Sequence, residues 1–324
     1  MGFEIKDLAG LSAPLQKCVE VISAGVGTLY RPKAMRNEAD AKAYEIKAIA
    51  EAEAMAGVIA SQGQANAQLE YIKTLAVGEQ EVFERARARL IAREVEGQQN
   101  IESIAENAIK FLPGTVSDEP VSSDWRRKFF LEAENVCDED MQELWGKVLA
   151  GEIAKPGSFS LRTLAVLKML SREEAEMFRL ACSLAYDGGE IIMDQAKSHP
   201  LGDYGLHFGS LMTLTDAGLL HGPSFVHRHF EDMPHEVLQT GLLQINNGLY
   251  FQLSGASLKH TRIPILVFTA AGKELQRLIP HNPCVPYLQD TAKHLRARYK
   301  LTVKKGVITE QDDGATAITF VESF

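Results

Sequence analysis

Hydrophobic and polar positions follow different periods in different parts of the chain. From residue 8 to residue 29, apolar side chains recur at steps of three and four residues, which places them on one face of a helix. Ser12 is suited to cap this helix and Pro14 to lie in its first turn. Residues 1–32 are therefore expected to hold an amphipathic N-terminal helix, whose stripe includes Leu8, Leu11, Leu15, Cys18, Val19, Ile22, Val26 and Leu29.

The apolar stripe has two alternative uses. It can pack on the long helical region that follows or on a neighbouring subunit, and this use is favoured. It can also lie on a membrane, or insert when many copies cooperate, because its polar face is weakly charged. The residues expected to make either contact are Leu11, Leu15, Val19, Ile22 and Val26.

Residues 33–112 contain no proline and are rich in alanine, glutamate and arginine. These residues lose little side-chain freedom in a helix, so the pattern predicts a long helical, coiled-coil-like oligomerisation region. One straight helix of this length would measure about 120 Å at ~1.5 Å per residue. The region either assembles with copies of itself or folds back as a hairpin, for which Gly78 is the expected tip.

Proline, glycine and small polar residues predict a linker at residues 113–123. Residues 124–186 are expected to form a helical bundle with helix starts at Ser123, Asp138 and Ser160 and a capping box of Ser171 with Glu174. The residues expected in its core are Trp145, Val148, Leu149, Phe159, Leu164, Leu167, Leu170, Phe178 and Leu180.

Residues 187–324 change to short strands and helices and predict a winged-helix-like α+β domain. Residues 207–222 are expected to form a helix that ends in a glycine turn, and 246–255 a strand. Residues 262–280 predict a strand followed by a helix capped by Thr269. A helix over 285–298 and a β-hairpin of 300–308 with 315–323 complete the expected domain, so the fold class is mainly α with an α+β C-terminal part.

Composition and charge restrict the cellular location and the functions that the chain is expected to have. The 324 residues are 45% hydrophobic and carry a net charge of −9, which disfavours a protein that blankets nucleic-acid phosphates. The four cysteines are far apart and indicate reduced thiols in the cytoplasm. The N-terminus lacks the basic region of a secretory signal, and the chain lacks an apolar run long enough to span a bilayer. A cytoplasmic location is expected, peripheral to the inner membrane if the N-terminal stripe contacts it.

No catalytic signature is found, including the P-loop, the dinucleotide fingerprint and paired cysteine ligands. The chain is therefore expected not to be an enzyme, and no cofactor or metal is expected. A histidine group with neighbouring carboxylates could bind a transition metal, but a hydrated loop is favoured. This group consists of His221, His227, His229 and His235 with Glu231 and Asp232.

A basic patch close to the C-terminus is the second candidate site. Nucleic acid, anionic lipid or an acidic partner could bind it, although a solvated face is favoured. We define the basic patch as Lys293, Arg296, Arg298, Lys300, Lys304 and Lys305.

Residues 141–178 resemble a motif in a bacterial family of uncharacterised proteins and, more distantly, in the Abi-alpha abortive-infection family. The motif is a helix with a leucine-alanine pair, a serine-phenylalanine turn, and a helix that ends in leucine-serine and acidic residues. The matching positions here are Trp145, Leu149, Ala150, Ser158, Phe159, Leu164, Leu170, Ser171 and Glu174, with a later turn at Thr269 and Gly272.

This resemblance implies a bacterial, phage-defence protein. We therefore expect a non-enzymatic homo-oligomer that acts as a defence effector or sensor, with the inner membrane as a target of the N-terminal helix. Its expected partners are copies of itself and a phage-derived trigger or a neighbouring-gene protein. The alternatives are a nucleic-acid-binding or regulatory winged-helix-like module, which is favoured less, and a scaffold for a partner enzyme.

Overall fold

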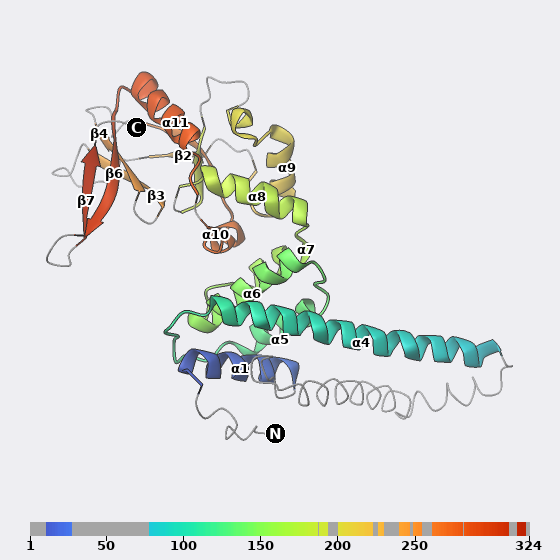
Figure 1. The fold of residues 1–324 in the computed structure, drawn as a ribbon. Helices are drawn as coiled ribbons and strands as arrows, with labels where there is room; N and C mark the ends of the chain where they lie inside the picture. Colours follow the sequence, from blue (N-terminus) through green and yellow to red (C-terminus); the bar gives the residue numbers. More distant parts are fainter. Residues whose placement is uncertain are drawn as a thin grey trace. The chain divides into compact units, whose positions relative to one another are not determined.

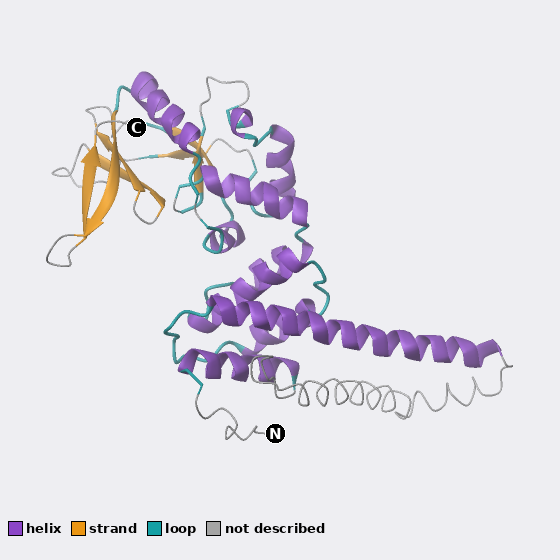
Figure 2. Ribbon diagram, viewed as in Figure 1, coloured by secondary structure: helices purple, strands orange, loops and turns teal. Residues whose placement is uncertain are grey.

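Helices make up most of the protein, and small antiparallel sheets lie in its C-terminal half (Figure 2). The chain divides into two compact units, unit 1 (Met1–Phe159) and unit 2 (Ser160–Phe324). The expected mainly α class with a mixed C-terminal part agrees with this architecture. The computed structural model describes residues 11–27, 78–186, 188–193, 200–222, 226–229, 240–246, 249–254, 261–280, 282–310 and 316–321.

Unit 1 is helical where it is described. Its helices are α1 (Ala13–Val26), α4 (Gly78–Phe111), α5 (Ser123–Ala133) and α6 (Glu139–Ala154), and α1 contacts the other three (Figure 1). Side-chain caps fix two of the starts, because Asp138 accepts from the Met141 N–H and Ser122 from the Trp125 N–H. The expected cap at Ser123 is thus one residue late. Ser12 precedes α1 as expected, but its side chain makes no capping hydrogen bond.

An aromatic cluster forms the centre of unit 1. Phe129 is fully buried, with its ring centroid 4.9 Å from that of Trp125, 5.2 Å from Phe130 and 5.1 Å from Trp145. Aromatic pairs at these distances add to the free energy gained from burying their area. The cluster therefore joins α5 to α6.

Close backbone approach and a buried polar network join α4 to α6. A Cβ on Gly146 would lie 2.6 Å from the Asn107 Cβ, so only glycine fits at this contact. Nearby, the Gln142 amide donates to the Asn100 side-chain oxygen at 3.0 Å and accepts from the Ser103 hydroxyl at 2.6 Å. The network satisfies polar groups that burial would otherwise leave without partners.

Unit 2 begins with two capped helices, α7 (Leu161–Met169) and α8 (Arg172–Leu184). The Ser160 cap of α7 and the capping box of α8, made by Ser171 and Glu174, are confirmed. The other helices are η3 (Gly202–Tyr204), α9 (Phe208–Asp216), α10 (Ala270–Gln276) and α11 (Val285–Tyr299). Thr269 caps α10 as expected.

Two antiparallel sheets accompany these helices. The first has the order β1 (Glu190–Ile192), β5 (Ile263–Val267), β2 (Val226–Arg228). The second has the order β3 (Thr240–Asn246), β4 (Leu249–Ser254), β6 (Thr302–Glu310), β7 (Thr316–Val321). The expected C-terminal hairpin is confirmed as β6–β7, with Ile308 opposite Ile318.

The domain boundaries and the core differ in part from those predicted from the sequence. The segment 33–77 lies outside the described residues, and α4 begins at Gly78. The linker 113–123 packs within unit 1, where Val121 is buried. The units divide between Phe159 and Ser160, so α7 and α8 join unit 2 rather than one bundle with α5 and α6. The expected core residues are buried except Leu180, which is half-buried.

Candidate functional site

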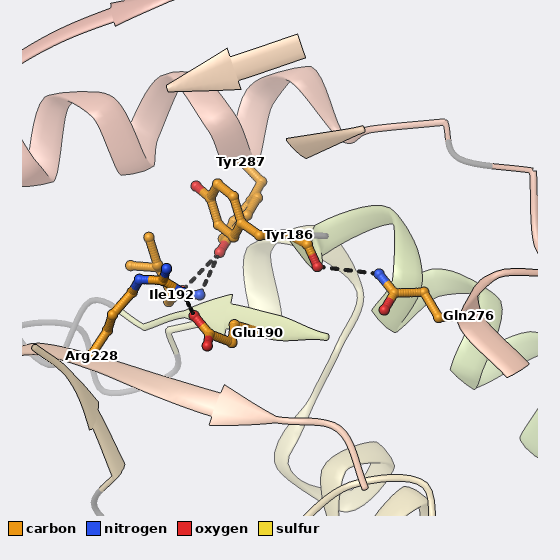
Figure 3. Close-up of polar contacts among 6 residues, drawn as sticks. All are labelled: Tyr186, Glu190, Ile192, Arg228, Gln276 and Tyr287. Atoms are coloured by element: carbon orange, nitrogen blue, oxygen red, sulfur yellow. Dashed lines mark hydrogen bonds and ion pairs between the residues drawn. The ribbon is translucent and has the colours of Figure 1, made fainter. Parts of the chain in front are cut away.

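A cleft in unit 2 lies beside the first turns of α11. Tyr287 ties this helix to the three-stranded sheet, because its hydroxyl donates to the Ile192 C=O and accepts from the Ile192 N–H, both at 2.9 Å (Figure 3). These backbone groups lie at the end of β1, an edge strand that pairs only with β5 among the described strands. The tyrosine therefore closes this sheet edge and fixes one wall of the cleft.

Other polar contacts hold β1 and Tyr186, which forms an isolated bridge with Glu190 of this strand. The Gln276 amide of α10 donates to the Tyr186 C=O at 3.2 Å, and Arg228 of β2 forms an ion pair with Glu190 of β1 (Figure 3). Pro286 lies in the first turn of α11, where its missing N–H costs no helical hydrogen bond. These contacts fix β1 and α11, the elements that carry Ile192 and Tyr287 in the cleft wall.

The cleft has a volume of about 330 Å³ and combines aromatic and polar side chains. The Tyr204 and Tyr287 rings meet edge to face, with centroids 5.3 Å apart. The Asp290 carboxylate accepts from the Tyr204 hydroxyl at 2.8 Å and pairs with the Lys293 ammonium at 3.3 Å. The remaining lining residues are Ile192, Pro200, Thr291, His294 and Ala297.

Burial keeps the tyrosine hydroxyls of this region protonated. It raises the pKa of Tyr287 and of fully buried Tyr186 above the ordinary value of a phenol. The pKa of Tyr204 is also raised, first by desolvation and then by its hydrogen bond to Asp290 and the carboxylate charge. All three phenols therefore stay neutral to a higher pH than an exposed tyrosine would.

The basic patch begins at this cleft and continues along α11 into β6. Lys293 and Ala297 line the cleft from one face of α11, and Lys300 follows directly after the last residue of the helix. Arg298 and Lys300 are exposed, whereas Arg296 donates to the Val303 C=O at 2.7 Å. Lys304 and Lys305 are half-buried on β6, which pairs with β4.

Lys300 has an unusual backbone conformation. It ends α11 with φ +56°, the one positive φ among the described non-glycine residues. Helices usually place glycine at such a left-handed end, because a Cβ is disfavoured there. A lysine at this position adds a charge at some cost in stability.

The N-terminal stripe lies largely within unit 1. Val19 and Ile22 are almost fully buried, while Leu11, Leu15 and Val26 are half-buried. Leu8 and Leu29 lie outside the described residues. The burial favours packing within the protein as the use of this helix face.

A groove of about 590 Å³ lies between α1 and the segment 114–121. The Lys17 ammonium fastens this segment by donating to the Ser117 and Glu119 carbonyls, the latter at 2.7 Å. The groove is lined by a mixture of small, charged and backbone groups without a convergent set of ligands.

The histidine group and the helices are the remaining candidates, for a metal site and for a membrane span. His221, His227 and His229 are described, whereas His235, Glu231 and Asp232 are not. Metal-binding groups of three or more His, Cys, Asp or Glu do not occur among the described residues. None of the described helices is both long and apolar enough to cross a membrane.

The fold and the cleft define a mainly helical protein whose C-terminal unit combines antiparallel sheets with a polar-aromatic cleft. The model of the family described as "Protein of unknown function (DUF2806)" matches residues 84–292, which is more than half of the chain, and the protein belongs to this family. Searches of the curated proteins and of the solved structures each found no match. The basic patch starts directly after the matched range, at Lys293.

The cleft is the part of the site that sequence reasoning missed. Tyr204 and Tyr287 are far apart in the chain, and neither belongs to a motif. Of the cleft's charged residues, only Lys293 was expected to be in a site, because it begins the run of basic residues. Predicting the other cleft residues from the sequence would have required knowing that η3 and α11 lie next to each other.

Proposed function

We propose that this protein is a non-enzymatic, self-assembling binding protein. Unit 1 joins copies of the chain through α4, and unit 2 is a winged-helix-like module that binds a partner molecule. The observation that carries this proposal is the exposed N-terminal part of α4, residues 81–92, which we call the α4 arm.

The α4 arm projects beyond α1, α5 and α6 (Figure 1). Residues 81–89 are all exposed, whereas Glu96 and Gly97 contact the end of α5 and the turn after it, and from Asn100 onward α4 buries one face against unit 1. The arm spans about 18 Å at ~1.5 Å per residue. A helix of this length is marginal in water without packing, so further contacts are needed to hold it.

The arm also exposes apolar side chains that suit such contacts. Val82 is 56% exposed and Phe83 is 39% exposed. Phe83, Ala86 and Leu90 lie three and four residues apart and share a helix face. Adjacent exposed apolar residues on a projecting helix are typical of a protein–protein contact, and a second copy of the arm offers a matching stripe.

Light scattering of the full-length protein at several concentrations tests the assembly. We expect a discrete oligomer in the wild type and a shift toward monomer in the double variant Val82→Glu, Phe83→Glu. The matched control is Leu131→Glu, because Leu131 is a comparably exposed apolar residue (59%) on α5 of the same unit. The control should assemble like the wild type.

A monomeric wild type at every concentration would contradict the assembly proposal. It would favour the alternative in which residues 33–77 fold back along the arm of their own chain. Equal loss of assembly in Leu131→Glu would contradict the placement of the contact on the arm.

The winged-helix-like interpretation of unit 2 is supported by its connectivity. A helix, α8, precedes β1; η3 and α9 lie between β1 and β2; and the hairpin β3–β4 lies between β2 and β5. The strand order β1-β5-β2 with antiparallel pairing fits a three-stranded sheet of this type. In this interpretation the hairpin β3–β4 is the wing. Its strand β4 pairs with β6, so the wing forms part of the four-stranded sheet.

The helix in the position that would face a ligand is not basic. The segment α9 contains no lysine or arginine, and its exposed side includes Phe208 (65%) and Met212 (37%). A helix that reads a DNA groove normally carries basic side chains toward the phosphates. We therefore propose that unit 2 binds its partner through a surface other than α9.

A phage-defence role is the proposed biological setting, and the resemblance of residues 141–178 to abortive-infection proteins supports it. Plating efficiency of a phage panel on cells that express the wild type or the α4-arm double variant tests this role. Protection that depends on the arm would support it. Equal plaque numbers with and without the protein across the panel would contradict it.

A further inference from the structure

We propose that the cleft of unit 2 binds one base of a single-stranded nucleic acid, whose phosphates follow the basic patch along α11. This names the ligand of the proposed binding module, and it rests on that binding role but not on assembly through the α4 arm.

Shape is the first support for a single strand. A cleft of about 330 Å³ has room for one planar base but not for a double helix. Its wall includes the half-buried ring of Tyr204, held in place by Asp290 and by the edge of Tyr287. Aromatic side chains beside a cationic track are the usual means of binding single strands without base pairing.

The charge distribution is the second support. Six lysine and arginine residues lie between Val285 and Lys305, against the single acidic residue Asp290, in a chain whose net charge is −9. The Asp290 charge is offset by Lys293 within the cleft. Lys293 lines the cleft, and Arg298 and Lys300 are exposed at the C-terminal end of the same helix, so cationic groups continue along the chain from the cleft to the end of α11.

Lys300 supplies an independent observation. Its left-handed backbone is a position where glycine is better suited, so a lysine there lowers stability. A role for its charge in binding accounts for this choice. Stabilising the negative end of the helix dipole does not require lysine at this residue, because Arg296 and Arg298 already lie in the last turn.

The surroundings favour nucleic acid over a lipid surface. Among the described residues of α11 and the first part of β6, the exposed large apolar residue is Val285, at the opposite end of α11 from Lys300. Leu301 and Val303 are buried. The cationic end of the patch therefore lacks an apolar anchor of the kind that membrane-surface helices insert.

Fluorescence anisotropy with the full-length protein tests the proposal. The probes are labelled DNA and RNA single strands of about 15 nucleotides, a DNA duplex of the same length, and vesicles containing phosphatidylserine. We expect tightest binding to single strands, with affinity that falls as salt is raised from about 50 to about 200 mM.

Variants separate the base contact from the phosphate contact. Tyr204→Ala should weaken single-strand binding about tenfold, whereas Tyr204→Phe, which keeps the ring, should bind nearly as the wild type. Lys300→Gly should weaken binding severalfold and reduce the salt slope by about 0.7, yet raise the unfolding temperature. The control Arg127→Gln, Lys128→Gln removes two exposed cations from unit 1 and should leave binding unchanged.

The outcomes distinguish the possible failures. Binding of the duplex or of vesicles without the single strand overturns the ligand assignment but leaves a binding role for unit 2. Equal weakening by the unit 1 control, or wild-type affinity in both Tyr204→Ala and Lys300→Gly, overturns the site. If the protein is assembled by light scattering but binds none of the probes, the ligand assignment is overturned. The assembly role of the α4 arm then still stands.

Discussion

The buried carboxylate of Glu152 accepts a hydrogen bond from the Phe159 N–H at 3.0 Å. Its other oxygen accepts from the Gly157 N–H at 2.7 Å, and the side chain is only 1% exposed. One side chain of α6 therefore fixes the turn that carries the chain to the end of unit 1. In unit 2, Glu274 holds the next residues in the same way, by accepting from the Ser160 N–H and the Thr163 hydroxyl.

Glu152→Gln should destabilise unit 1 by about 1–3 kcal/mol, because an amide cannot accept on both sides and leaves one buried N–H without a partner. Urea unfolding followed by tryptophan fluorescence measures this, since both tryptophans, Trp125 and Trp145, lie in unit 1. The control is Glu143→Gln on the same helix, where a half-exposed pair with Lys147 contributes about 0.3–0.5 kcal/mol. Similar losses in both variants would contradict a special role for Glu152.

Tyr287→Phe should loosen the edge of the three-stranded sheet. The change removes the hydroxyl that pairs with both the N–H and the C=O of Ile192, and each unpaired buried group costs about 1–3 kcal/mol. Hydrogen exchange at the Ile192 amide should become faster. Tyr204→Phe is the control, because it removes one hydrogen bond at a half-buried ring that does not contact the Ile192 backbone through its hydroxyl. Unchanged exchange at the Ile192 amide in Tyr287→Phe would show that water or a shifted side chain replaces the hydroxyl.

Local signals account for what the sequence predicts correctly. The Asp138, Ser160, Ser171 and Thr269 caps act within one turn of their own helices, so residue type and spacing suffice to find them. The β6–β7 hairpin is also local, because its strands are joined by a short connection.

Non-local contacts account for what the sequence does not predict. Strands β1 and β2 have three residues each, too few to display an alternating pattern, and both are formed by pairing with β5 farther along the chain. The cleft depends on η3 meeting α11. The division between the units depends on contacts of α7 with α10, which the periodicity of α7 alone does not reveal.

Gly25→Ala tests whether α1 belongs to the unit 1 core. A Cβ at this position would lie 2.1 Å from the Phe130 ring, so α1 or the ring must move. Overpacking of this kind costs about 1–3 kcal/mol, which exceeds the gain of up to ~1 kcal/mol in helix propensity. Tryptophan-monitored unfolding should show a net loss, whereas Gly114→Ala, with open space around its Cβ, should change stability by less than about 0.5 kcal/mol. A stabilised Gly25→Ala would mean that α1 is not packed on α5 in solution.

Glu134→Gln should stabilise unit 1 at neutral pH but not at acidic pH. Desolvation, followed by the nearby Glu94 carboxylate, raises the pKa of Glu134 in the folded protein above its ordinary value. A raised pKa means that the folded state binds this proton more tightly than the unfolded chain, so the stabilisation is present at low pH and is lost as pH rises through the folded pKa. At pH 7 the charged carboxylate is therefore unfavourable in the folded state, and glutamine removes that penalty.

The urea midpoint of tryptophan-monitored unfolding, measured for wild type and Glu134→Gln between pH 3 and pH 8, checks this sign. The variant should have the higher midpoint at neutral pH, and the two curves should approach each other toward about pH 3, where glutamate is largely protonated in both states. Glu139→Gln, an exposed carboxylate on the next helix, is the matched control and should give a smaller pH-dependent difference. A lower midpoint for Glu134→Gln at neutral pH would mean that the attraction of Arg93 outweighs the desolvation and the Glu94 repulsion, and that the pKa of Glu134 is lowered rather than raised.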